Sequence, residues 1–178
     1  AFAPAGGYCA TLRAGCYPAA APGTAGAVRS HPCPALPVAL RTEHRGYREA
    51  AAGAIDITQA PLVLSIGRGI KDADNIPKAQ ALAERLGAVL ACSRPVVDKK
   101  WLGKERQVGT SGRTVKPKVY LAFGISGAFQ HRAGIKGPGV FIAVNRDPKA
   151  PVFRAADYGA VEDMFKIMDA LAEKLGAR

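Results

Sequence analysis

The sequence predicts a doubly wound α/β domain with a parallel sheet, preceded by a stretch of different character. Three observations support this prediction. From Ala60 onward, short β-prone runs alternate with segments of helical period, and the first of these runs ends in a Gly-Arg-Gly turn. Before that point, Ala, Gly, Pro and Arg predominate. We therefore expect a low-complexity or poorly ordered extension over residues 1–58 and one folded domain over residues 59–178.

The expected extension lacks the pattern of a folded element. Five prolines between Pro18 and Pro37 interrupt any helical or strand period, so no core can form there. Its first 53 residues contain only two acids, Glu43 and Glu49, as organellar transit peptides do. However, the single serine and the prolines oppose the amphipathic helix of such a peptide. We interpret the stretch as poorly ordered.

The first half of the domain predicts two strands with a helix between them. The apolar run 62–66 predicts the first strand. A helix is expected over residues 76–86, with Asn75 as its N-cap and Gly87 at its end, because apolar residues recur there at helical spacing. Residues 88–91 predict the second strand. This alternation is typical of parallel α/β sheets.

The second half continues the same alternation. Residues 119–123 and 140–144 predict two further strands, with a Gly-rich turn and a short helix from about Ser126 between them. Apolar residues from Val161 to Leu175 recur at helical spacing and predict a final helix, with Asp163 near its start as the helix dipole favours. This helix should cover one face of the sheet.

Composition narrows the class of protein. The 178 residues carry a formal charge of +11, which suits nucleic acid, acidic lipid, a phosphate-bearing cofactor or an acidic partner protein. We expect no nucleic acid, because the six Phe and five Tyr are scattered without a recognition pattern. No apolar run approaches the roughly 18 residues of a membrane span, so no membrane insertion is expected. The cysteine spacings fit no metal site, and Cys92 is expected to be a buried hydrophobe.

Candidate binding residues follow the predicted strands. Ligands of open parallel sheets bind beyond the carboxyl ends of the strands, so the loops that begin at Gly67, Ser93, Gly124 and Asn145 should converge. Their cations and neutral hydrogen-bonding groups suit a phosphate ligand with a polar ring system. They offer no evident acid–base couple, so we assign no catalytic residue. These side chains are Arg68, Ser93, Arg94, Ser126, Gln130, His131, Asn145 and Asp147.

Several of these segments have a plainer interpretation. Segment 124–131 has the small residues of an anion cradle before a helix, but without the full dinucleotide fingerprint it also fits an ordinary turn. Loop 107–113 suits the edge of a flat ring or a plain hairpin turn. Residues 145–148 first indicate an Asx-turn. His131 is expected near enough to a ligand to donate a hydrogen bond, with a structural role as the rival interpretation.

Together these motifs resemble the alpha subunit of electron-transfer flavoprotein. They run in order, with nearly fixed spacing, from about residue 61 to 175: GRG at 67–69, CSRP at 92–95, QVGTSG at 107–112, GISGAFQH at 124–131 and NRDPKAPVF at 145–153. The resemblance implies a Rossmann-like domain that holds one FAD. It implies a carrier without its own substrate, which takes electrons from flavin dehydrogenases and passes them to a quinone oxidoreductase or another flavoprotein.

The resemblance also implies a binding site, partner and location. Arg94 would lie against the flavin ring and His131 near its pyrimidine carbonyl, so both would favour a negatively charged reduced flavin. Ser111 replaces a Thr that bonds flavin N5 in several members, and keeps the hydroxyl. The partner would be a beta subunit, in a bacterial cytoplasm or a mitochondrial matrix. The implied FAD contacts are Arg68, Ser93, Arg94, Val108, Gly109, Thr110, Ser111, Ser126, Gly127, Ala128, Phe129, Gln130, His131, Asn145, Asp163 and Met164.

One departure concerns what precedes the FAD domain. Family alpha subunits have a further α/β domain there, which normally packs on the beta subunit. Residues 1–60 neither resemble that domain nor are long enough to form it, so we interpret the chain as a fragment or an aberrant gene product. The alternatives that stay open are a non-redox nucleotide-binding domain or degenerate fragment, a nucleotide-using enzyme and a basic binding protein.

Overall fold

The computed structural model describes residues 23, 30, 43–46 and 55–176. Residues Ala54–Arg178 form one compact unit. Most of the predicted extension over residues 1–58 lies outside the described residues, and so do Cys9, Cys16 and Cys33. None of the described helices is long and apolar enough to cross a membrane.

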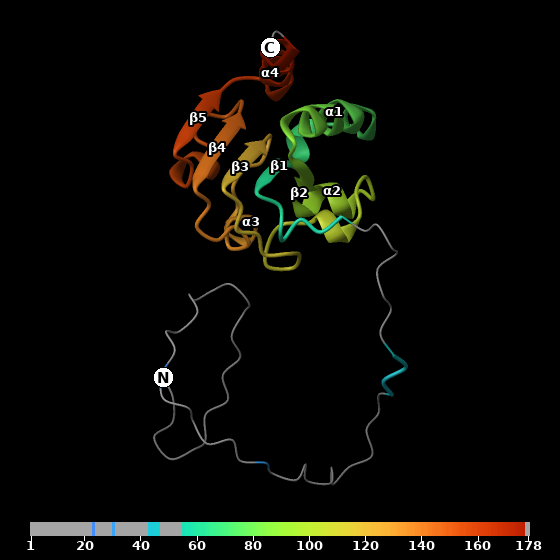
Figure 1. Cartoon of the computed structure of the whole chain (residues 1–178). Helices are drawn as coiled ribbons and strands as arrows, with labels where there is room; N and C mark the ends of the chain where they lie inside the picture. Colours follow the sequence, from blue (N-terminus) through green and yellow to red (C-terminus); the bar gives the residue numbers. More distant parts are fainter. Residues whose placement is uncertain (1–22, 24–29, 31–42, 47–54, 177–178) are drawn as a thin grey trace. The chain divides into compact units, whose positions relative to one another are not determined.

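Five parallel strands form a Rossmann-like sheet in the order β2-β1-β3-β4-β5 (Figure 1). This confirms the predicted doubly wound parallel sheet. The strand order reverses between β1 and β3, because the chain places β2 on one side of β1 and all later strands on the other. The strands are β1 (Leu62–Ile66), β2 (Val89–Cys92), β3 (Val119–Phe123), β4 (Val140–Asn145) and β5 (Tyr158–Val161).

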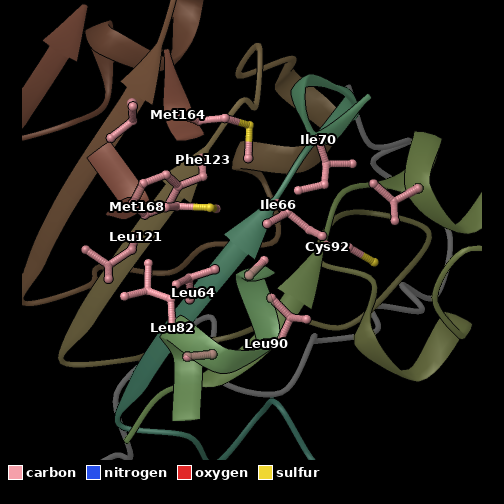
Figure 2. Packing of buried hydrophobic residues seen from close by; sticks show 14 residues of the cluster. Leu64, Ile66, Ile70, Leu82, Leu90, Cys92, Leu121, Phe123, Met164 and Met168 are labelled. Carbon is pink, nitrogen blue, oxygen red and sulfur yellow. The ribbon is translucent and has the colours of Figure 1, made fainter. Parts of the chain in front are cut away.

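The central strands are apolar runs because both faces of the sheet are buried. Alternate residues of β1 enter different cores: Leu64 lies in one cluster and Val63 in the other. Leu64 is in register with Leu90 of β2 and Leu121 of β3, and the three side chains pack into the same cluster (Figure 2). The run therefore specifies a central strand that is buried on both faces.

Two amphipathic helices cover the face that Figure 2 shows. Helix α1 (Ile76–Leu86) buries Leu82, and helix α4 (Met164–Gly176) buries Met168, in the cluster around Leu64. An ion pair of 2.6 Å between Lys78 Nζ of α1 and Asp169 Oδ1 of α4 joins the two helices. Gly87 ends α1 in the left-handed conformation, with φ of 66°, as predicted.

Shorter elements complete the domain. Helix α2 (Arg94–Asp98) follows β2 directly, and Val96 adds to the cluster of Figure 2. Helix α3 (Phe129–Arg132) and the buried Val152 lie against the other face. Cys92 is buried as predicted, and burial raises the pKa of its thiol to about 12. The 3-10 helices in the described region are Arg68–Ile70, Ala73–Asn75, Lys104–Arg106 and Pro151–Arg154.

Some predicted boundaries are wrong. Helix α3 begins at Phe129 instead of about Ser126, because the Ser126 carbonyl accepts a bond from Val152 N (3.0 Å) and Gly127 has a φ of 82°. Val161 ends β5, in register with Asn145, and does not belong to the final helix. The second strand is shifted by one residue, and α2 was not predicted.

The helix caps differ from the prediction in one case. Asn75 occupies the N-cap position of α1, but its side-chain amide donates to Ile70 O (2.9 Å) and makes no capping bond. At α4, Asp163 Oδ1 accepts from Phe165 N (2.8 Å). That carboxylate therefore starts α4 as the sequence indicates.

Candidate functional site

Three glycines bring the loops after β1 and β3 into backbone contact. Gly67 N donates to Phe123 O (2.9 Å), and Gly69 N donates to Gly124 O (3.0 Å). A Cβ atom on Gly69 would lie 2.7 Å from Gly124 Cα, so a side chain cannot fit between the loops. Because the strand order reverses between β1 and β3, this is the edge where open α/β sheets bind ligands.

A cavity of about 680 Å³ lies at this edge. It is formed by the loops after β1, β2, β3 and β4, together with loop 107–111 and the start of α4. The structure thus brings the predicted loops together. The predicted residues that line it are Arg68, Ser93, Arg94, Val108, Gly109, Thr110, Ser111, Ser126, Ala128, Gln130, His131, Asn145, Asp147, Asp163 and Met164.

Two predicted residues do not line the cavity. Gly127 packs against the backbone of Val152, where a Cβ atom would collide with Val152 N and Cα. Phe129 is 70% exposed and projects from the start of α3. The prediction also missed Lys71, which lines the cavity although no motif includes it. Its φ of 68° is uncommon for lysine, so local sequence could not indicate this position.

Cations predominate among the charged groups of the cavity. Arg68, Lys71, Arg94 and Arg146 line it, against the two acids Asp147 and Asp163. Arg94 Nε pairs with Asp98 Oδ2 (3.3 Å), and Arg146 Nη1 pairs with Asp163 Oδ2 (3.7 Å). The described residues contain no group of three or more His, Cys, Asp or Glu that could hold a metal ion. The charge balance favours an anionic ligand such as a phosphate ester.

Side-chain hydrogen bonds hold the loop after β4, which forms another wall of the cavity, in place. Asn145 Nδ2 donates to Ile125 O (2.9 Å), which ties this loop to the loop after β3. Asn145 Oδ1 accepts from Asp147 N (3.0 Å), and Asp147 Oδ1 accepts from Lys149 N (2.8 Å). The predicted Asx-turn is therefore confirmed. Because its amide joins two loops, Asn145 shapes the cavity as well as lining it.

Loop 107–113 forms a compact turn against α3. Arg113 N donates to Gln107 O (2.7 Å), and Gly112 N donates to Gly109 O (3.0 Å). Thr110 N donates to Gln130 O (2.9 Å), which attaches the turn to α3. Its residues form only isolated parallel β-bridges, Cys92 with Gln107 and Val108 with Arg113. The loop is therefore not the plain hairpin turn that its sequence also fitted, since a hairpin joins antiparallel strands. The turn places five successive residues, 107–111, on the cavity.

His131 is held by two protein groups. Its Nδ1 lies 3.1 Å from Val108 O, and its Nε2 lies 2.9 Å from the Tyr120 hydroxyl. A carbonyl oxygen can only accept, so Nδ1 carries the proton and Tyr120 donates to Nε2. Burial lowers the pKa of His131 to about 4, so the ring is neutral at pH 7. Neutral His131 adds no positive charge to the cavity, and this geometry favours the structural interpretation of the residue.

We expect Tyr120→Phe to lower the free energy of unfolding by about 1–3 kcal/mol, because it leaves the buried Nε2 of His131 without its donor. Chemical denaturation at pH 7 measures this loss. Tyr158→Phe is the matched control, since Tyr158 is largely exposed on β5 and should change the value by less than about 0.5 kcal/mol. Equal stability of the two variants would contradict the assigned hydrogen bond.

Known proteins share this domain. Residues 56–136 match the sequence profile described as "Electron transfer flavoprotein FAD-binding domain". The alpha subunit of mitochondrial electron transfer flavoprotein from Oryza sativa subsp. indica is 47% identical over 120 residues, which are 67% of this chain and 34% of that protein. The alpha subunit from Methylophilus methylotrophus is 46% identical over 142 residues, 79% of this chain and 44% of that protein.

A longer alignment reaches into the first part of the chain. Protein FixB from Escherichia coli O7:K1 is 40% identical over 166 residues, 93% of this chain and 53% of that protein. This alignment includes residues before position 59, so the resemblance extends into the segment that we expected to be unrelated. The chain spans about a third to a half of the length of these relatives. The chain therefore belongs to the electron transfer flavoprotein alpha-subunit family, and the domain described above is the FAD-binding domain of that family.

Proposed function

We propose that the chain binds one FAD in the cavity at the sheet edge and serves as an electron carrier. The cation-lined cavity at the β1/β3 reversal carries this proposal. Arg68 and Lys71 follow β1 and line the cavity, so a pyrophosphate bound there would lie beside two cationic side chains. When bound, FAD supplies the one-electron and two-electron redox chemistry, and the protein supplies binding and electrostatics.

Arg94 is the residue to which we assign the stabilisation of negative charge on a reduced flavin. Its guanidinium lines the cavity and is about two-thirds exposed, whereas His131 is neutral. Asp98 pairs with Arg94 from the next turn of α2 and does not line the cavity. Arg94 is therefore oriented while one face of its guanidinium remains open to a ligand.

The acidic groups and the histidine of the cavity are engaged in hydrogen bonds within the protein, which supports electron transfer without substrate turnover. Asp147 and Asp163 accept backbone hydrogen bonds, and both ring nitrogens of His131 bond to protein atoms. Such fixed groups suit a redox cofactor better than general acid–base chemistry, which needs a proton acceptor open to substrate.

We propose a beta subunit as the partner, flavin dehydrogenases as donors, and a quinone oxidoreductase or another flavoprotein as acceptor. The exposed Phe129, directly before the cavity-lining Gln130, is an apolar side chain that a partner would cover. The named relatives are a plant mitochondrial protein and bacterial proteins, which supports a mitochondrial matrix or a bacterial cytoplasm as the location.

The test is the visible absorption spectrum and FAD titration of the full chain, alone and after co-expression with a beta-type subunit. We expect yellow protein with one FAD per chain. Arg94→Gln should weaken binding by about tenfold, because a charge-assisted contact is lost. The matched control Arg85→Gln, on the exposed side of α1, should bind like the wild type. Colourless protein that fails to bind added FAD in both preparations would reject the function, and equal binding of ADP and FAD would favour the non-redox alternative.

A further inference from the structure

Gln107 is a buried polar residue in the wall of the cavity. It is 4% exposed, and its Nε2 donates to Ser111 Oγ (2.8 Å). Both residues line the cavity, but Ser111 is the exposed member of the pair. Buried amides of this kind are rarely without a hydrogen-bond partner, and here the partner is the hydroxyl of a residue that lines the cavity.

The turn fixes the separation of these two side chains. Arg113 N donates to Gln107 O (2.7 Å), so the chain returns to Gln107 within six residues. A Cβ atom on Gly112 would lie 3.0 Å from Gln107 Cβ, which shows how closely the turn is packed. Because Thr110 N is also bonded to Gln130 O (2.9 Å), the backbone at Ser111 cannot move away from Gln107 without breaking backbone bonds.

The bond from Gln107 determines which way the Ser111 hydroxyl can act. A serine hydroxyl has one proton to donate and two lone pairs. The amide of Gln107 is a donor, so the Ser111 proton cannot point toward it. The proton is then available for a group in the cavity, and an acceptor atom of a ligand is the group that matches it.

We propose that Gln107 is a positioning residue that holds Ser111 as a hydrogen-bond donor toward the bound ligand. This inference rests on the proposed binding of FAD. Ring nitrogens of the oxidised flavin that lack a proton accept hydrogen bonds. Two-electron reduction with uptake of one proton at such a nitrogen converts it into a donor. The Ser111 oxygen already accepts from Gln107, so it is a weaker acceptor for that new N–H than it is a donor to the oxidised nitrogen. Gln107 therefore favours the oxidised cofactor through Ser111, whereas Arg94 favours the reduced one.

Gln107→Met tests the proposal, because Met has a similar shape and donates no hydrogen bond. We expect the dissociation constant of oxidised FAD to rise about threefold, with reduced FAD little affected. That threefold change corresponds to a two-electron midpoint potential about 14 mV more positive, measured by stepwise dithionite reduction. Gln80→Met is the matched control: Gln80 donates to Glu84 Oε1 (2.8 Å) on α1, away from the cavity, and its loss should move neither quantity.

A double-mutant cycle separates positioning from a general structural effect. Ser111→Ala, at an exposed side chain, should raise the potential at least as much as Gln107→Met. Adding Gln107→Met to Ser111→Ala should then cause no further shift. An unchanged potential in Ser111→Ala would overturn the proposal even if Gln107→Met failed to fold, and so would a shift that persists in the double variant. Wild-type protein that binds no FAD would overturn the proposed function as well, so the two failures are distinct.

Discussion

Gly124→Ala is expected to lower the free energy of unfolding by about 2–5 kcal/mol and to abolish FAD binding. Gly124 has a φ of 62°, which costs a residue with a Cβ atom about 1–2 kcal/mol. The new Cβ atom would also lie 2.7 Å from Met164 Sδ and 2.8 Å from Gly69 Cα. The methionine can move, but the Gly69 backbone belongs to the adjacent loop, so overpacking adds about 1–3 kcal/mol.

The chain offers a matched control for this prediction. Gly87 has a similar φ of 66° at the end of α1, but a Cβ atom there would have no neighbour within 4 Å. Gly87→Ala should therefore lose only about 1–2 kcal/mol and keep its affinity for FAD. Urea denaturation and fluorescence titration of both variants measure the difference. Equal stability and equal FAD binding of the two alanine variants would contradict the prediction. The close contact between the loops after β1 and β3 would then not determine the shape of the site.

The sequence predicted the central strands because they are buried on both faces. Strands β1 and β3 were predicted at their observed residues, because short, nearly continuous apolar runs are typical of strands buried on both faces of a parallel sheet. Strand β5 was missed because Tyr158 and Val161 are exposed and Gly159 interrupts the run. Only the pairing with β4 makes this segment a strand, and that pairing is not visible in local sequence.

The site was predictable as far as topology determines it. Parallel strands place their carboxyl ends at one edge, so the loops after β1, β2, β3 and β4 had to meet. The bonds between side chains were not predictable. His131 and Tyr120 lie on a helix and a strand whose distance apart depends on the whole fold, and the sequence left the role of His131 open. Gln107 appeared only as part of a loop motif, because its contact with Ser111 depends on the turn geometry.

His131 should make the stability of the domain depend on pH between about 6.5 and 4. Burial lowers the pKa of the folded imidazole to about 4, from an ordinary value of 6.5. Above pH 6.5 both the folded and unfolded states hold a neutral ring. As the pH falls below 6.5, the unfolded chain binds a proton that the folded domain does not, so the free energy of unfolding decreases until the folded pKa is reached. The total loss is about 3 kcal/mol.

A comparison of variants isolates this contribution from the titration of carboxylates. Urea denaturation of the wild type and of His131→Gln at pH 7 and pH 4.5 should show a steeper loss in the wild type, because the glutamine variant has no proton to gain at this position. His44→Gln, an exposed histidine, should keep the wild-type loss. Parallel behaviour of wild type and His131→Gln would mean that at pH 4.5 His131 is charged in the folded domain as well as in the unfolded chain. A charged ring would bring a second N–H donor to Nε2, where Tyr120 now donates, and the neutral pair that holds Val108 on the cavity would have to rearrange.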